Sequence, residues 1–357
     1  MGKILSLIIP SYNMEAYLPK CLGSLVVEPE LMEKLEVLVV NDGSKDRTSA
    51  IAHEFATKYP ATFQVIDKAN GHYGSCINAA LSKATGTYVK ILDADDWFDK
   101  GQFKSFLLFL TRNQNADVVI SDVAIVNTDG TVFHSHIGLA TDRKLVMEDL
   151  CNNPSWLSMH ALSFSRELLL KMKYQQSEGI PYTDGEWSAL PMLSVDTALY
   201  FPHELYMYLK GREGQSVAPA VQIKNFNCMV QVLESIVTKG QGLVSQRPDV
   251  CKKYFSKWLA NYLNMVCPVL LRKVQLRKFN GYWRRMDDAF RFVLRSGHQS
   301  MLNTFIVSRS IQFRYLRFML RHRFLAVPTI CLVRLCWTMQ GLGFVHGILK
   351  CIHWSVE

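Results

Sequence analysis

Four apolar segments in the N-terminal part of the chain constrain its fold more than any other feature. They are rich in Val, Ile and Leu, and segments with helical spacing separate them. The predicted strands are residues 4–10, 35–42, 63–67 and 87–93, and the predicted helices between them are residues 15–26, 48–59 and 74–84. Strands that are apolar along their whole length are typical of a parallel sheet covered on both faces, so the sequence predicts an α/β fold.

A hairpin is predicted after these elements. A helix is expected at residues 101–113, and two strand-like segments follow it, residues 117–127 and 131–137. Between these two segments lies Asp129-Gly130, a dipeptide that favours tight turns. The two segments are therefore expected to pair.

The rest of the chain divides near residue 218. Residues 138–217 have a less regular pattern, whereas the pattern from about residue 220 onward is helical. The net charge is +9, but residues 251–357 hold 18 Lys and Arg against 3 Asp and Glu. We therefore predict an α/β domain at residues 1–218 and a basic helical region at residues 219–357 with an anionic partner.

Neither a secretion signal nor a disulfide framework is predicted. The 9 cysteines are scattered without a C-x-x-C pair, which indicates a reducing compartment. The apolar segment that follows Lys3 is too short for a signal-peptide core and is expected to be the first strand.

Four polar loops follow the four predicted strands. They contain Pro10 to Asn13, Asn41 to Ser44, Lys68 to Gly74, and Asp93 to Asp99. Because the carboxyl ends of parallel strands meet at one edge of a sheet, where ligands bind, we expect these loops to form one cleft.

The fourth loop holds four carboxylates, at Asp93, Asp95, Asp96 and Asp99. Carboxylates this close repel one another unless a cation lies among them, and an Asp-x-Asp pair at a strand end can bind a divalent ion together with phosphate. The spacing does not match an EF-hand, because Phe98 stands where that loop needs glycine. A solvated acidic turn is the alternative, and Asp99 is expected to cap the next helix.

Two other loops allow more than one interpretation. Asp42 either binds a ligand or belongs to a turn in which Ser44 or Asp46 caps the following helix. Gly71 and Gly74 do not match a dinucleotide or P-loop motif, and they favour equally a close ligand contact and a tight turn.

In their order and spacing, three segments resemble the nucleotide-binding half of glycosyltransferase family 2, which has the GT-A fold. These segments are IIPSYNMEAYL, VLVVNDGSKDRT and NGHYGSCINAALSKATGTYVKILDADDWFD. The resemblance covers residues 4–100, and residues 150–217 more loosely. It implies a Rossmann-like, mostly parallel sheet flanked by helices, and inverting sugar transfer from a nucleotide-diphosphate donor, most simply UDP-linked. The Gln-x-x-Arg-Trp motif of processive members is absent, so a bacterial-type enzyme that transfers one sugar is expected.

The resemblance also implies roles for individual residues on the donor side. The donor nucleotide would be bound by Pro10, Tyr12, Asn13, Asp42, Asn70 and Asp93, with Asp93 at the ribose. Asp95 would hold Mn²⁺ or Mg²⁺, and Asp96 could take its place. Arg212, in GREGQSV, would contact the diphosphate or the acceptor, unless this segment is an exposed loop.

The catalytic base is expected in YTDGEW. The resemblance implies that Asp184 is the base, but Thr183 replaces the acidic residue that usually precedes it, so Glu186 is a second candidate. A metal would neutralise the leaving diphosphate, and a carboxylate would accept the proton of the acceptor hydroxyl. His160 is expected to be a satisfied histidine of the core or its rim rather than a metal ligand.

Residues 309–324 predict an amphipathic helix that lies on a membrane surface. Its apolar face holds Ile311, Tyr315, Phe318 and Met319, and its basic face holds Arg314, Arg317 and Arg321. The next apolar stretch is interrupted by Pro328 and Arg334 and is shorter than the roughly 20 residues of a spanning helix. Packing on the α/β domain and nucleic-acid binding are alternatives, but no nucleic-acid module accompanies the helix.

Charge and resemblance together predict the setting. We expect a cytoplasmic enzyme, peripheral to the inner face of the plasma membrane, that acts on a lipid-linked saccharide in cell-surface polysaccharide synthesis. The alternative is a non-catalytic nucleotide- or glycan-binding protein tethered to a membrane assembly, which Thr183 favours. A nucleotidyltransferase, which would release pyrophosphate, is a third interpretation.

Overall fold

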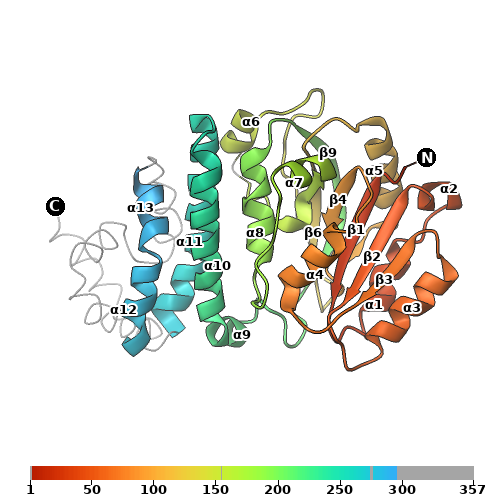
Figure 1. Ribbon diagram of the computed structural model, residues 1–357, viewed down its shortest axis with the longest axis horizontal. Coiled ribbons are helices and arrows are strands. Elements are labelled where there is room, and N and C mark those ends of the chain that lie inside the picture. The colour runs from red at the N-terminus through yellow and green to blue at the C-terminus, as the bar shows by residue number, and fades with distance from the viewer. Residues whose placement is uncertain (1, 154, 274–275, 296–357) are drawn as a thin grey trace.

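The computed structural model describes residues 2–153, 155–273 and 276–295. Within these residues the chain forms one mixed β-sheet with helices on both faces, and long helices pack beyond one of the faces (Figure 1). The α/β class expected from the sequence is therefore confirmed. The predicted amphipathic helix at residues 309–324 lies outside the described residues.

The sheet contains nine strands within the described part of the chain. Their bounds are β1 Leu5–Ser11, β2 Leu35–Asn41, β3 Phe63–Asp67, β4 Tyr88–Ile91, β5 Trp97–Phe98, β6 Val118–Asn127, β7 Val132–Ser135, β8 Leu162–Ser165 and β9 Ala198–Lys210. The order of eight strands across the sheet is β3-β2-β1-β4-β8-β6-β9-β5, and β7 pairs with β6 outside this order. The first four strands are parallel as predicted, so their carboxyl ends share one edge.

The helices on the N-terminal side agree with the predicted ones, except that α2 was not predicted. They are α1 Leu18–Ser24, α2 Pro29–Met32, α3 Thr48–Lys58, α4 His72–Leu81 and α5 Lys100–Arg112. Asp99 caps α5, because its carboxylate accepts a hydrogen bond from the backbone N–H of Gln102 at 2.8 Å. The predicted capping role of Asp99 is thus confirmed.

Short helices connect the later strands, and longer ones follow them. They are α6 Met147–Asn152, η1 Met159–Ala161, α7 Arg166–Lys171, α8 Asp184–Ala189, η2 Pro191–Ser194, α9 Pro219–Lys224, α10 Phe226–Val244, α11 Asp249–Lys273, α12 Leu276–Arg285 and α13 Asp287–Arg295. The helical pattern predicted after residue 220 is confirmed as far as residue 295.

Alternate residues of the parallel strands enter two cores. Ile8 and Leu38 point to the face that α4, α8, α10 and α11 cover. Leu7 and Val39 point to the opposite face, which α1, α3 and α5 cover. Because both faces are covered, the strands can be apolar along their whole length.

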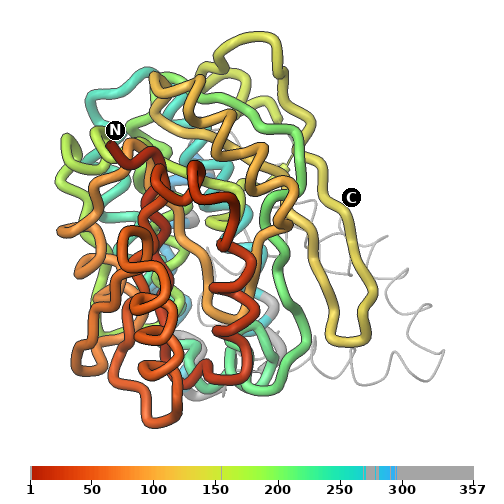
Figure 2. The backbone as a smooth tube through the Cα atoms, turned by 90° about the vertical axis from the view of Figure 1, so that its right-hand side faces the viewer, coloured from red at the N-terminus to blue at the C-terminus, as the bar shows by residue number. Residues whose placement is uncertain are grey.

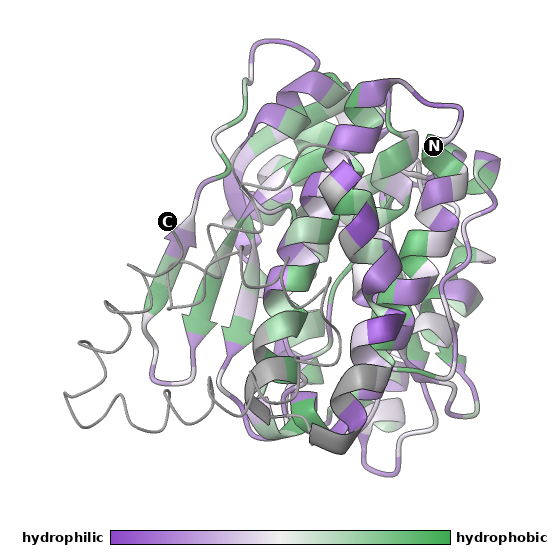
Figure 3. Ribbon diagram, turned by 90° about the vertical axis from the view of Figure 1, so that its left-hand side faces the viewer, coloured by the Kyte–Doolittle hydropathy of each residue, from purple (hydrophilic) through white to green (hydrophobic). Residues whose placement is uncertain are grey.

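The helices after residue 218 pack on the sheet rather than apart from it. In Figure 1 α10 and α11 stand next to α8, and Figure 3 shows hydrophilic and hydrophobic residues alternating along the outer surface of this layer. Phe226 and Trp258 belong to the same cluster of buried side chains as Ile77 of α4 and Trp187 of α8. The core on this face is continuous across the predicted boundary, which itself stays a prediction.

The hairpin of β6 and β7 stands at one edge of the molecule (Figure 2). Its turn is the predicted Asp129-Gly130, with Gly130 at a positive φ of 88°. Three strands were not predicted: the short β5, β8, and β9, where Pro202, His203 and Glu204 interrupt the apolar pattern. β9 nevertheless pairs with β6 through two register shifts.

Candidate active site

The loops after β2 and β3 meet around Asp42, whose side chain is buried. Its Oδ1 accepts hydrogen bonds from Lys68 Nζ at 2.8 Å and from the backbone N–H of Gly71 at 2.9 Å. Its backbone carbonyl accepts one from Asn70 Nδ2 at 3.0 Å. The structure therefore brings Asp42 and Asn70 together as predicted, and it adds Lys68, which the sequence indicated only by its place directly after a strand.

The loop after β1 is joined to the loop after β2. Asn13 has a positive φ of 53°, and its side-chain Oδ1 accepts a hydrogen bond from the backbone N–H of Lys45 at 2.8 Å. Asn13 N–H donates to Ser44 Oγ at 3.1 Å. Pro10 is half-buried at the end of β1, and Tyr12 beyond it is 46% exposed. An exposed aromatic ring at the edge of a sheet offers a face on which a base can stack.

Asp93 is held from two sides. Tyr73 of α4 donates its hydroxyl to Asp93 Oδ1 at 2.8 Å, and the backbone N–H of Asp93 donates to the hydroxyl of Tyr206 at 3.0 Å. Burial, followed by the negative charges of Asp95 and Asp184, raises the pKa of Asp93. A cation at this point would relieve that cost.

Asp95 forms an ion pair with Arg212, whose guanidinium Nε donates to Asp95 Oδ2. The guanidinium carbon also lies 5.6 Å from the ring centroid of Tyr17. The two residues are far apart in the sequence, but β9 ends just before Arg212 and brings it to the loop after β4. The structure therefore unites the predicted diphosphate ligand with the predicted metal ligand.

Asp96 is buried and anchors β9. Its Oδ2 accepts a hydrogen bond from Tyr206 Oη at 2.7 Å, and its Oδ1 accepts one from the backbone N–H of Leu209 at 2.7 Å. Burial first, and then the charges of Asp93 and Asp95, raises the pKa of Asp96. Tyr206 was missed by sequence reasoning because β9 was missed.

The acidic cluster also includes a histidine. Ligand atoms of Asp93, Asp96 and His160 lie within 4.8 Å of one another. The His160 ring packs against Tyr206 and Tyr208, and burial, followed by the charge of a nearby lysine, lowers the pKa of His160 to about 3. A neutral imidazole and carboxylates are ligands that a divalent cation such as Mn²⁺ accepts, so the residues present fit a metal.

That lysine is Lys90, which is fully buried in β4. Its Nζ donates to the carbonyls of His160 at 2.6 Å and Leu162 at 3.4 Å, and thereby joins β4 to the segment that carries His160. Desolvation lowers the pKa of Lys90 to about 7. Lys90 was not predicted as a site residue, although a lysine inside the apolar strand TYVKILD was a signal that could have revealed it.

Asp184 is the first residue of α8, and its side chain is exposed. The protein nevertheless surrounds it on several sides, and this partial burial raises the pKa of Asp184. Its charge also raises the pKa values of Tyr73 and Asp93, although burial is the larger cause for both. Asp184 is therefore close enough to the acidic cluster for their charges to interact.

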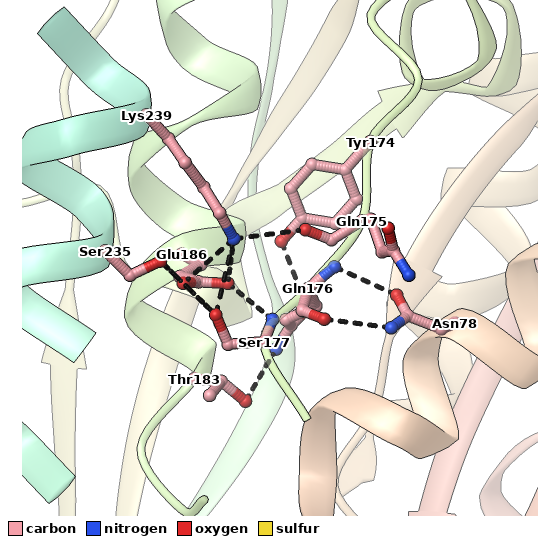
Figure 4. A network of polar contacts seen from close by, with 9 residues as sticks. All are labelled: Asn78, Tyr174, Gln175, Gln176, Ser177, Thr183, Glu186, Ser235 and Lys239. Atoms are coloured by element: carbon pink, nitrogen blue, oxygen red, sulfur yellow. Dashed lines mark hydrogen bonds and ion pairs between the residues drawn. The ribbon is translucent and has the colours of Figure 1, made fainter. Parts of the chain in front are cut away.

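Glu186, the second candidate base, has a different environment. It is 0% exposed, and its carboxylate is bound by Ser177, Ser235 and Lys239 (Figure 4). Ser235 and Lys239 come from α10.

The structure gives a further reason for a glycine at Gly74, which lies inside α4. A β-carbon at Gly74 would stand 1.9 Å from the carbonyl oxygen of Ser177, so the glycine allows two segments of the protein to approach each other.

Several known proteins are similar to this chain. Residues 6–172 match the model of the family described as Glycosyl transferase family 2. An uncharacterized glycosyltransferase of Mycoplasma genitalium is 26% identical over 279 residues, which span 73% of this chain and 88% of that protein. The minor teichoic acid biosynthesis protein GgaB of Bacillus subtilis is 36% identical over 110 residues, which span 31% of this chain and 12% of that protein.

A solved structure is similar over most of the chain. It is the crystal structure of S. aureus TarS 1–349 in complex with UDP-GlcNAc, with a TM-score of 0.65, 22% identity and coverage of 84% of both chains. This likeness confirms the GT-A fold implied by the sequence. Among the residues that the structure describes, no helix is both long and apolar enough to span a membrane.

Proposed function

We propose that this chain, which belongs to glycosyltransferase family 2 and is a glycosyltransferase, moves one sugar with inversion from a UDP-linked donor to a hydroxyl of a lipid-linked saccharide. The observation that carries the proposal is the meeting of three groups at one sheet edge. These groups are the polar loops around Asp42, the acidic cluster around Asp93, and the exposed carboxylate of Asp184.

The nucleotide is proposed to lie on the loops after β1, β2 and β3. The Tyr12 ring can stack on the base, and Asp42, held in place by Lys68 and Gly71, can accept hydrogen bonds from it. The TarS structure contains UDP-GlcNAc, which supports a UDP-linked donor for this related fold.

The diphosphate is proposed to lie between the loop after β4 and Arg212. Asp93 and Asp95 would hold Mn²⁺ or Mg²⁺, with Asp96 and His160 directly adjacent. Such an ion, when bound, would act as a Lewis acid on the departing diphosphate. Arg212, once released from Asp95, can donate its fork of N–H groups to phosphate oxygens.

Asp184 is proposed as the general base. The acceptor oxygen bonds to the anomeric carbon while the bond from that carbon to the diphosphate breaks, and the hydroxyl proton passes to Asp184. A pKa raised above the ordinary range makes this carboxylate a better proton acceptor. Glu186 is fully buried and bound by several donors, which favours Asp184 over it.

The acceptor side of the proposal rests on charge. The 18 Lys and Arg of residues 251–357 would attract the anionic inner leaflet, so the enzyme would be cytoplasmic and peripheral to the plasma membrane, within cell-surface polysaccharide synthesis. Sedimentation with anionic and neutral vesicles tests this. We expect binding to anionic vesicles that weakens at high salt, and equal binding to neutral vesicles would contradict it.

One experiment separates the proposed enzyme from its alternatives. The full chain is incubated with a panel of nucleotide sugars and Mn²⁺, and released nucleotide is identified, with the D184N variant as control. UDP release by the parent and its loss in the variant are expected. Nucleotide binding by calorimetry without release would favour a binding protein, and pyrophosphate release would favour a nucleotidyltransferase.

A further inference from the structure

The residues on both sides of Asp184 are held by the protein, whereas Asp184 itself is exposed. Thr183 Oγ1, which is buried, accepts a hydrogen bond from Gln176 Nε2 at 3.1 Å. Gly185 lies against α11, because a β-carbon there would be 3.3 Å from the ring of Tyr262. The backbone that carries the proposed base is therefore fixed directly before and after it.

Glu186 holds the same short segment through its side chain. Its Oε2 accepts a hydrogen bond from the backbone N–H of Ser177 at 2.7 Å, and its Oε1 accepts from Ser177 Oγ at 2.7 Å and Ser235 Oγ at 2.5 Å. Lys239 Nζ lies 3.3 Å from both carboxylate oxygens (Figure 4). Ser235 and Lys239 are one helical turn apart on α10, so they present their donors side by side.

The same network extends to the donor side of the cleft. Gln176, next to Ser177, exchanges two hydrogen bonds with Asn78 of α4, each of 2.9 Å (Figure 4). The first turn of α4 carries Tyr73, which binds Asp93. Glu186 thus lies at the junction of α8, the segment before it, α10 and, through Gln176, α4.

The short helix that carries Asp184 and Glu186 needs contacts with other parts of the protein to keep its shape. α8 has only 6 residues, and helices this short do not hold their shape without tertiary contacts. Burial of a carboxylate is unfavourable unless several donors bind it. The buried carboxylate of Glu186 has such donors, which indicates that it fixes the geometry of this helix. Proton transfer requires the base within hydrogen-bond reach of the acceptor hydroxyl, and a displacement of about 1 Å can cost roughly 100-fold in rate.

We propose that Glu186 is a positioning residue for Asp184, and that Ser235 and Lys239 of α10 hold it in place. Helix α10 then belongs to the active site, although it follows the predicted catalytic domain. The inference rests on the proposed function, in which Asp184 is the base.

The test uses the full chain with the variants K239M and S235A/K239M. Both leave the two hydrogen bonds from Ser177 to Glu186 in place, and Lys239 is 41% exposed, so these variants are expected to fold. The matched controls are K252M, which removes an exposed lysine ion-paired with Asp249, and S245A, which removes a hydroxyl bonded to a helix carbonyl. Among the described residues, both control side chains bond within their own helical segments and away from α8.

We expect kcat for transfer to fall about tenfold in K239M and about 100-fold in the double variant, while the KM for the donor changes less than about twofold. The conservative variant K239R should restore most of kcat, because it returns the charge and the donors. K252M and S245A should retain parental kcat. A double variant with parental kcat would overturn the inference.

Hydrogen exchange of the backbone amides gives a second readout that does not depend on activity. In S235A/K239M, exchange of residues 183–187 should become faster, while exchange of β1 and β2 stays unchanged. Unchanged exchange at residues 183–187 would overturn the inference even if kcat fell. Failure of the proposed function has a different result, since the parent would then release no nucleotide or D184N would keep full transfer.

Discussion

Four aspartates of one loop, Asp93, Asp95, Asp96 and Asp99, have different surroundings in this protein. Asp93 and Asp95 are half-buried, and Tyr73 and Arg212 bind them. Asp96 is buried under β9, and Asp99 caps α5. Their surroundings therefore separate groups that look equivalent in the sequence.

The variant D95A is expected to lose metal-dependent donor binding. Removal of this carboxylate takes away one proposed ligand of the ion and the partner of Arg212. Calorimetry of UDP binding with and without Mn²⁺ measures the effect. D99A is the control, since it should cost about 1 kcal/mol of stability through loss of the cap but leave Mn²⁺-dependent binding intact. Parental Mn²⁺-dependent binding by D95A would disprove the metal assignment of Asp95.

Asp184 predicts the pH dependence of the reaction. Partial burial raises its pKa, so the protonated and inactive form persists to a higher pH than for an ordinary aspartate. The value of kcat/KM should rise with pH through this raised pKa and level off above it. Measurement of kcat/KM over a pH series at constant Mn²⁺ gives the apparent pKa of this rise. This apparent pKa should lie above the usual aspartate value of about 3.9. An apparent pKa at that usual value would argue against Asp184 as the base.

At the scale of secondary-structure elements, two segments outside the predicted strand–helix pattern complete the cleft. β9 supplies Tyr206 and leads to Arg212, so a strand from the mixed half of the sheet supports the loop that follows β4. Helices α10 and α11 support α8 from the other side. The candidate site is thus made by elements from distant parts of the chain.

Two glycines on α10 test how closely this helix approaches α11. A β-carbon at Gly240 would stand 2.2 Å from the ring of Phe255, whereas a β-carbon at Gly242 would meet no atom of another described segment within 4 Å. G240A is expected to destabilise the protein by about 1–3 kcal/mol through overpacking. G242A is expected to stabilise it by about 1 kcal/mol, because alanine favours helices.

Thermal and denaturant unfolding of the two variants measures these opposite signs. Equal effects of G240A and G242A would show that α10 and α11 do not meet as closely as the structure has them.

At the scale of the whole molecule, the helical region and the sheet share one core. Phe226 and Trp258 pack in the cluster that also contains Ile77 and Trp187. Within the described chain the helices after residue 218 therefore complete a hydrophobic face of the α/β fold. A large core that spans two segments of the sequence is expected to fold as one unit.

A chain that ends at residue 218 is therefore expected not to fold cooperatively, because it exposes the face that α10 and α11 cover. A chain that ends at residue 295 keeps that face covered and should unfold cooperatively. Soluble yield and thermal unfolding by circular dichroism compare the two. Cooperative unfolding of the shorter chain at the temperature of the longer one would contradict the shared core.

Much of the fold could be predicted from the sequence, because the signals concerned are local. Hydrophobic period, turn dipeptides and caps act over a few residues, and they were sufficient for β1 to β4, α3 to α5, the Asp129-Gly130 hairpin and the cap at Asp99. The polar loops at the strand ends followed from the parallel order, and the match of residues 6–172 to the family model agrees with the resemblance of their combined motifs.

Only the tertiary structure decided what surrounds each acidic side chain. Asp95 contacts Arg212, Asp96 contacts Tyr206, and Glu186 contacts Lys239. The partners in these three pairs are separated in the sequence by 117, 110 and 53 positions, respectively. No local period encodes such pairs, because they depend on how β9 and α10 pack against the sheet. The sequence thus determined that carboxylates stand at the edge of an α/β sheet, and packing decided which of them face the cleft and which are buried.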